Sequence, residues 1–189
     1  WRGWSFAGKE SWIAAAGDGG RSQFTLASGN VAVADPDAWD NEANPTATYN
    51  TVLRTAAVDL SKIAPGSAVL EFDSAYAGGS VMTGEIWVSY NDGATWSMLA
   101  FTQLGTVALN QEVVLNSGSS GTIGGFTVQS ALNNPASGNM RFEFRVQNAG
   151  NSGAWAIDNV RVAGQVTGRP WEGFADPTQW NFSSSELPT

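Results

Sequence analysis

Cysteine and histidine are both absent from the 189-residue chain. Without cysteine the chain has no disulfide, zinc-thiolate site, iron–sulfur cluster or thiol nucleophile. Without histidine it has no His-based catalytic triad, no haem ligation through imidazole and no imidazole metal site. These two absences exclude a large part of known enzyme chemistry.

Basic residues are also few, because 9 Lys and Arg stand against 17 Asp and Glu, for a net charge of -8. A negative chain repels phosphate groups, so nucleic acids and anionic membrane surfaces are poor partners and cations are better ones. No run of 18 or more apolar residues occurs, so we expect no membrane insertion. The length suits one domain with a substantial core.

Strand patterns are abundant and helical ones are scarce. Residues 140–146 alternate apolar and charged side chains, and residues 81–101 read as a hairpin around Asn91-Asp92-Gly93. One short helix is predicted over residues 10–16, ended by the glycines that follow. Further strands are predicted at 23–26, 31–34, 52–55, 68–72, 112–115, 126–129 and 155–162.

Many short strands separated by Gly, Asn, Asp, Ser and Pro predict an all-β fold with two packed antiparallel sheets, a jelly-roll β-sandwich. An up-and-down barrel is the alternative. The sandwich is expected over residues 1–169. Residues 170–189 are expected to be a fold-back tail, a linker or the start of a following module. The last reading rests on 174–180, which repeats the Phe-Ala start and Trp spacing of 6–12.

An acidic loop at 35–42 places Asp35, Asp37 and Asp40 within a few residues of one another, around Trp39. Clustered carboxylates repel unless a cation lies between them, and Ca²⁺ prefers such oxygen ligands. The loop therefore predicts a calcium site, although it lacks the EF-hand pattern. The alternative is a solvated acidic turn.

Asp158 stands within the apolar strand predicted at 155–162. A buried carboxylate needs a partner, which an arginine or a cation supplies. Alternatively, Asp158 faces water on the polar side of its strand.

The segment 89–96 resembles the Asp-box hairpin, Ser-x-Asp-x-Gly-x-Thr-Trp, with Asn91 at the first Asp position. Such a hairpin is structural: the Asx side chain binds the turn, Gly93 takes a positive φ, and Trp96 covers the hairpin. The motif occurs once, so neither a propeller nor its hydrolytic chemistry is expected.

Glu71 and Asp73 lie two residues apart on a predicted strand and so share one face. Paired carboxylates on a jelly-roll strand are typical of glycoside hydrolases or polysaccharide lyases, but the third acid of that pattern is missing. An exposed pair bound to Arg141 or Arg145 across the sheet is the alternative.

Aromatic side chains are numerous, with nine Trp, three Tyr and nine Phe. Most should fill the core, while exposed rings can stack on sugars. Trp87 alternates with Ile86 and Val88 and should face away from them, unless the tail buries it. Trp39, Tyr76 and Tyr90 lie beside predicted loops. Together with Trp87 they are the candidate carbohydrate-binding residues.

The segments 32–40, 88–96 and 155–162 together resemble MAM-like, concanavalin-A-like jelly-roll modules, which accompany secreted bacterial hydrolases, phosphatases and surface proteins. The resemblance implies a secreted, non-catalytic accessory module that binds polysaccharide or glycan beside other domains of its chain. It also implies a structural Ca²⁺ that joins Asp35, Asp37 or Asp40 to Asp158. A structural or adhesive spacer is the third possibility. Two departures from the family are the missing cysteines of animal MAM domains and Ala7 at a frequent acid position.

Overall fold

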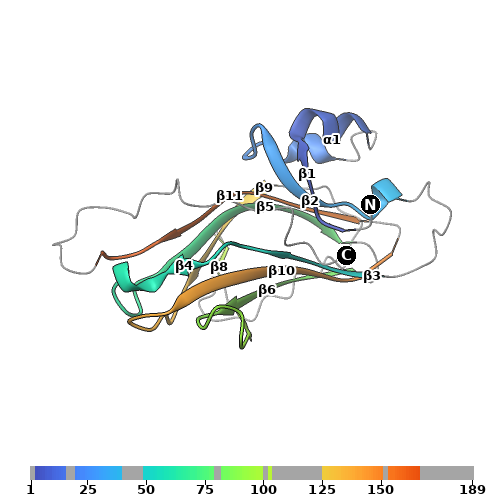
Figure 1. Cartoon of the computed structure of the whole chain (residues 1–189). Helices are drawn as coiled ribbons and strands as arrows, with labels where there is room; N and C mark the ends of the chain where they lie inside the picture. The colour runs from blue at the N-terminus through green and yellow to red at the C-terminus, as the bar shows by residue number, and fades with distance from the viewer. Residues whose placement is uncertain are drawn as a thin grey trace.

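The computed structural model describes residues 3–15, 20–39, 49–78, 82–99, 102–103, 125–150 and 153–166. Most of these residues belong to strands (Figure 1). The strands are β1 (Ser5–Gly8), β2 (Asn30–Ala34), β3 (Tyr49–Arg54), β4 (Val58–Asp59), β5 (Val69–Gly78), β6 (Thr83–Ser89), β7 (Ser97–Met98), β8 (Thr102–Gln103), β9 (Gly125–Ala131), β10 (Asn139–Ala149) and β11 (Gly153–Ala163). The helix is α1 (Lys9–Ala15), and three 3₁₀ turns are η1 (Arg21–Gln23), η2 (Asp37–Trp39) and η3 (Leu60–Lys62).

The strands form two antiparallel sheets that lie face to face (Figure 1). The six-stranded sheet has the order β1-β2-β11-β5-β9-β8, and the five-stranded sheet has the order β3-β10-β6-β7, with β4 beside β10. The inner eight strands, β2-β11-β5-β9 and β3-β10-β6-β7, are the two four-stranded sheets of a jelly roll. The predicted two-sheet jelly-roll β-sandwich is confirmed, and the barrel alternative is not adopted.

The core lies between the sheets and is built from alternate residues of each strand. On β10, Phe142 and Phe144 point inward, and the Phe144 ring lies 5.2 Å from that of Phe72 on β5. Trp155 on β11 meets Trp4 at 5.2 Å between ring centroids. Each such buried aromatic contributes roughly 1.5–3 kcal/mol through the water it leaves, so this interior provides the main stabilisation.

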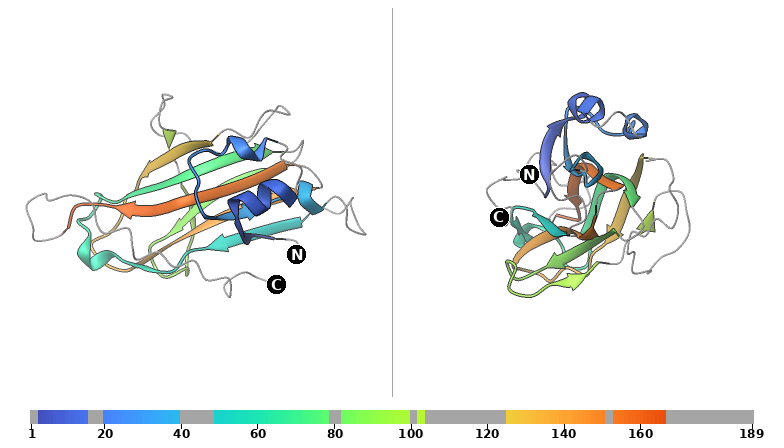
Figure 2. Two further views of the ribbon diagram at one scale, coloured as in Figure 1. Left: turned by 90° about the horizontal axis from the view of Figure 1, so that it is seen from above. Right: turned by 90° about the vertical axis from the view of Figure 1, so that its right-hand side faces the viewer.

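A second, smaller apolar cluster lies on the outer face of the six-stranded sheet, under α1 and η1 (Figure 2). Trp12 and Phe24 pack there against the small side chains Ala75, Ala154 and Ala156. Short alanine side chains leave the room that two large rings need. One sheet is thus partly covered, while the outer face of the five-stranded sheet carries no helix among the described residues.

The helix predicted over 10–16 is confirmed as α1, one residue earlier. The strand predicted at 23–26 is wrong, because Gly20 adopts φ 88° and starts a 3₁₀ turn that directs Phe24 into the small cluster. Within the described ranges no helix has the length and apolar character needed to cross a membrane. The strand predicted at 112–115 and the segment 170–189 lie outside the described residues.

Candidate functional site

The hairpin between β6 and β7 is fixed by its own side chains. Asp92 and Gly93 have φ values of 59° and 89°, the left-handed pair that a tight type I′ turn requires. The Asn91 side-chain oxygen accepts from the Thr95 amide at 2.8 Å. The Asp-box-like geometry is therefore confirmed as a structural device, and it delivers Trp96 to the sheet surface.

Trp87 lies on the outer face of β6, as the alternation predicts, because Ile86 and Val88 on either side are buried in the core. Its ring faces the Arg145 guanidinium of β10, whose Cζ is 4.1 Å from the ring centroid. The indole N–H donates to Glu85 Oε2 at 2.7 Å. Trp87 is consequently half-buried and held in one orientation.

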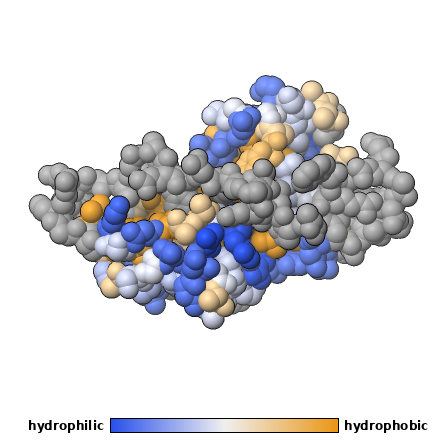
Figure 3. Space-filling model, viewed as in Figure 1, coloured by the Kyte–Doolittle hydropathy of each residue, from blue (hydrophilic) through white to orange (hydrophobic). Residues whose placement is uncertain are grey.

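Trp96 extends this arrangement across the sheet. Its ring centroid lies 5.3 Å from Cζ of Arg54 on β3 and 6.0 Å from that of Arg145 on β10. The contacts thus run from Arg54 to Trp96, Arg145 and Trp87, across the outer face of β3, β10 and β6. We call the set Arg54, Trp87, Trp96, Glu143 and Arg145 the Trp–Arg face. Hydrophilic side chains gather over this lower sheet in Figure 3.

Glu143 organises the Trp–Arg face from beneath. It is only 3% exposed, although it stands on the polar side of β10 that the sequence predicts to be wet. Its Oε1 accepts from Nε of Arg54 at 2.9 Å and from Nη2 at 2.5 Å. Its Oε2 accepts from Nε of Arg145 at 2.7 Å, and Nη2 of Arg145 lies at 2.5 Å. One carboxylate thus orients two guanidinium groups.

Asp35, the first predicted calcium ligand, is buried beside an arginine. Its Oδ2 accepts from Arg21 Nε at 2.9 Å and from Trp12 Nε1 at 2.5 Å, and its Oδ1 accepts from Arg21 Nη2 at 3.0 Å. Arg21 also reaches Asp37 at 2.8 Å. Burial alone would lower the pKa of Arg21, but hydrogen bonds and charges from both acids raise it above its ordinary value.

These contacts do not fit a calcium ion at Asp35, because a guanidinium already occupies the place where a cation would compensate the carboxylate. Within the described ranges no group of three or more acidic side chains can hold a metal. Asp40 lies outside the described residues. A calcium ion bound elsewhere in the 35–42 loop stays a prediction.

Asp158 is not brought to Asp35. Asp35 follows Ala34, which pairs with Trp155, whereas Asp158 lies three residues beyond Trp155 on β11. In an antiparallel pair this puts the two carboxylates about 13 Å apart along the strands, too far for one ion to bind both.

Asp158 instead accepts from backbone amides. The Ser28 N–H donates to its Oδ2 at 3.0 Å, and the Asn159 N–H donates to its Oδ1 at 2.8 Å. Asp158 therefore anchors the 24–29 loop to β11, and an ion that joins it to Asp40 stays a prediction.

Two predicted carbohydrate-binding residues need correction. Tyr76 lies on the inner side of β5, where its ring contacts Trp155 and its hydroxyl donates to the Met82 carbonyl at 2.9 Å. Tyr90 is also packed against the core. Burial raises the pKa of both hydroxyls. Neither ring shares a surface with Trp87, and the Trp39 side chain lies outside what the structure describes.

Glu71 and Asp73 do share one face, on the outside of the six-stranded sheet. Glu71 pairs with Arg161 and accepts from Gln129 at 2.5 Å. Asp73 accepts from Thr127 at 2.5 Å and from Asn159 at 2.8 Å.

The predicted pairing of these acids with Arg141 or Arg145 is wrong, because both arginines belong to the other sheet. Each carboxylate oxygen of Glu71 and Asp73 already accepts from a side chain of a neighbouring strand.

Sequence reasoning missed Arg54 and Glu143 and gave Trp96 only a structural part. No local pattern marks them, because Arg54 and Glu143 meet across 89 residues of sequence through the pairing of β3 with β10. Only the polar alternation of 140–146 pointed to this side of β10.

The strand order defines the class of the chain as a jelly-roll β-sandwich. No protein-family model matches the chain, and no curated protein matches it. The MAM-like resemblance therefore stays a prediction.

The chain is similar to a solved structure described as TmCBM61, a carbohydrate-binding module, in complex with beta-1,4-galactotriose. The identity is 13% and the TM-score 0.47, over 86% of this chain and 88% of that chain.

Proposed function

We propose that this chain is a non-catalytic binding module that recognises a glycan through the Trp–Arg face. The observation that carries the proposal is the placement of two half-buried tryptophans and two guanidinium groups side by side on a sheet face without a described helix. Apolar ring faces beside fixed polar donors are the combination that sugar recognition uses.

Trp96 is the residue to which we assign sugar stacking. Arg145 lies only 4.1 Å from the Trp87 ring, so Trp87 supports the guanidinium. The nearest guanidinium to Trp96 is farther, at 5.3 Å. Sugar C–H groups would contact the Trp96 indole, while sugar hydroxyls accept from the arginines and donate to Glu85. Because Glu143 fixes the arginines, little ordering entropy is lost on binding.

Affinity electrophoresis through gels that contain single polysaccharides tests this proposal. We expect at least one glycan to retard the protein and Trp96→Ala to weaken the retardation about tenfold or more. Leu26→Ala is the matched control. Leu26 is an exposed apolar side chain beside β11 of the six-stranded sheet. Equal retardation of wild type and Trp96→Ala, or none by any glycan, contradicts the proposal.

The hydrolase or lyase alternative uses Glu71 and Asp73. Because their oxygens are engaged by Arg161, Gln129 and other neighbours, we expect no turnover of a β-glucan panel by wild type or by Glu71→Gln. Turnover that Glu71→Gln abolishes would establish the enzyme instead.

The spacer alternative is separated by acrylamide quenching of tryptophan fluorescence. A binding face predicts a quenchable indole population that a bound glycan protects, whereas a spacer has no such protection. The family resemblance further supports, as a proposal, a secreted protein in which this module acts beside other domains of its chain.

A further inference from the structure

Three of the nine basic residues lie on the sheet that carries the Trp–Arg face. The chain has 9 Lys and Arg against 17 Asp and Glu, yet Arg54, Arg141 and Arg145 all lie on the outside of the five-stranded sheet. Arg21, by contrast, is buried between Asp35 and Asp37, and Arg161 is paired with Glu71 on the opposite sheet. Three acids, Glu85, Asp92 and Glu143, stand on the same face, so its charges balance in number and what it can bind depends on which donors stay open.

Glu143 neutralises only part of that charge. It is one buried carboxylate shared by Arg54 and Arg145, and Glu85 stands opposite Arg145, so the uncompensated positive charge lies on the Arg54 side. Arg141 is balanced separately, through its ion pair with Asp92 at 2.7 Å.

The atoms that bind Glu143 decide which donors remain. Arg54 donates to Glu143 from Nε and Nη2, the side edge of the guanidinium group. The other edge of the Arg54 guanidinium consists of Nη1 and the second N–H of Nη2. Within the described part of the chain, this edge has no acceptor. The Arg54 side chain is 45% exposed, so this edge reaches solvent. Two parallel N–H donors at that edge match the two oxygens of a planar carboxylate.

We propose that the ligand is an acidic glycan, and that Arg54 binds a uronate carboxylate while Trp96 contacts the same or the adjacent sugar ring. This inference rests on the proposed function and specifies its ligand class. The Arg54 Cζ lies 5.3 Å from the Trp96 ring centroid, so a pyranose ring on the indole brings its substituents within reach of the fork.

Glu85 sets the direction of binding across the face. It lies on β6, opposite Arg145 in the register, whereas Arg54 lies on β3 at the far side of β10. The β6 side is therefore negative and the β3 side positive. An acidic sugar would place its carboxylate over β3 and its hydroxyls toward Glu85.

Three polysaccharide probes in affinity electrophoresis test the inference: polygalacturonate, its carboxyl-reduced form and dextran sulfate. The reduced polymer keeps the sugar ring and linkage but lacks the charge. We expect retardation by polygalacturonate and at least about tenfold weaker retardation by the reduced form, because a charge-assisted hydrogen-bond pair is lost.

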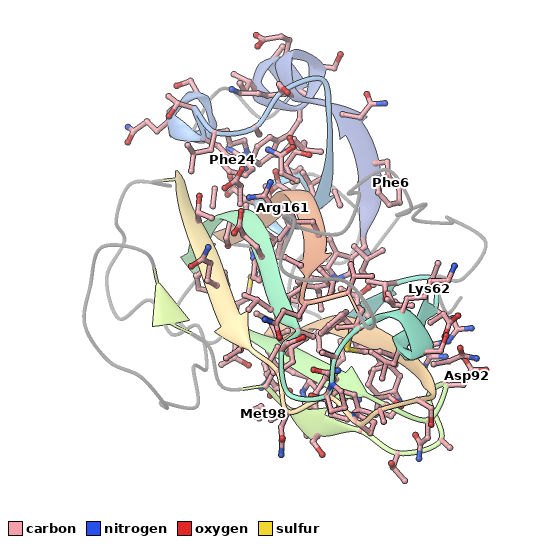
Figure 4. All side chains as sticks on the ribbon, turned by 90° about the vertical axis from the view of Figure 1, so that its left-hand side faces the viewer. Phe6, Phe24, Lys62, Asp92, Met98 and Arg161 are labelled. Atoms are coloured by element: carbon pink, nitrogen blue, oxygen red, sulfur yellow. The ribbon has the colours of Figure 1, made fainter. Side chains whose placement is uncertain are left out.

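Arg54→Gln is the decisive variant and Arg161→Gln its matched control. Both remove one arginine charge from side chains of similar exposure, 45% and 48%, but Arg161 lies on the six-stranded sheet, away from Asp92 and Met98 (Figure 4). We expect Arg54→Gln to weaken polygalacturonate binding about tenfold and Arg161→Gln to leave it unchanged. Arg54→Lys keeps the charge but lacks the fork, so it should fall between wild type and Arg54→Gln. Thermal unfolding midpoints verify that the variants are folded.

The possible results distinguish a wrong ligand class from a wrong function. If polygalacturonate and its carboxyl-reduced form bind equally and Arg54→Gln has no effect, the acidic-glycan inference is overturned. The proposed function is then unaffected. If dextran sulfate binds and polygalacturonate does not, the site prefers a sulfate to a carboxylate. That result also overturns the acidic-glycan inference. No retardation by these probes or by any neutral glycan overturns the proposed function together with the inference.

Discussion

Two charge clusters of opposite composition lie on the two sheets. On the six-stranded sheet one arginine, Arg21, serves two acids, Asp35 and Asp37. On the five-stranded sheet one acid, Glu143, serves two arginines, Arg54 and Arg145. The central residue is buried in both, with Arg21 1% exposed and Glu143 3% exposed.

The difference lies in what surrounds the centre. Arg21 begins η1 and lies against Trp12 of α1, so its cluster holds the small apolar layer onto the sheet. The partners of Glu143 keep exposed donor edges, so its cluster can reach a ligand. The same ion-pair chemistry is enclosed on one sheet, where it holds the small apolar layer, and open on the other, where we propose that it binds a glycan.

The largest expected effect comes from Arg21→Ala. Removing the guanidinium leaves the Asp35 carboxylate buried without a compensating charge, which costs about 3–5 kcal/mol of unfolding free energy. Denaturant unfolding measures the loss.

The double variant Arg21→Met/Asp35→Leu should recover most of that stability, because no buried charge remains. A single Arg21→Ala variant as stable as wild type would show that the cluster does not hold the layer.

Glu143→Gln should cost less, about 1–2 kcal/mol, because the freed Arg54 and Arg145 side chains can turn to water. Chemical unfolding gives the stability, and affinity electrophoresis gives binding. We expect weaker glycan binding at a temperature where the variant is fully folded, because its arginines are no longer oriented. Unchanged binding would argue against orientation by Glu143.

Alkaline pH should reduce stability through the buried tyrosines Tyr76 and Tyr90 and not through the two charge clusters. Arginine stays protonated, whereas burial raises the pKa of Tyr76 and Tyr90 above that of an unfolded chain, near 10. The contribution of the two tyrosines to stability should be fully present below about pH 10. It should decline above pH 10, because the unfolded state loses these protons first. Tyr76 contributes about 1 kcal/mol of this decline by pH 11, and Tyr90 acts in the same direction.

Tyr76→Phe should flatten the alkaline decline in denaturant titrations at pH 8 and pH 11. The same slope in the variant and wild type would assign the alkaline effect to another group.

The smallest expected effect is that of a chelator. Because Arg21 compensates Asp35, we expect EDTA to leave the thermal midpoint within about 1 °C of its starting value. A lower midpoint that Ca²⁺ restores would instead support the predicted calcium ion, bound through Asp40 or another residue of the 35–42 loop.

Short sequence patterns correctly predicted the features that neighbouring residues in the chain determine. The alternation around Trp87 placed it correctly outside the core, and the Asn91-Asp92-Gly93 turn follows from side chains that bind their own backbone. Two-residue spacing likewise put Glu71 and Asp73 on one face.

Partners across the sheets were not predictable in this way. The partner of Asp35 is Arg21, which begins a 3₁₀ turn just before the segment predicted as a strand, and that of Glu71 is Arg161, not Arg141 or Arg145. These choices depend on strand order and register, which no short segment encodes. The same reason hid Arg54 and Glu143.

The helical layer covers part of the six-stranded sheet, whereas the Trp–Arg face lies on the other sheet. If that face is the binding surface proposed above, the described part of the chain carries one such surface, and one copy should bind a polysaccharide without cross-linking two polymer chains. Mixtures with a long polymer should stay clear and show saturable loading, one copy per repeating stretch, where a two-faced sandwich would form a precipitate.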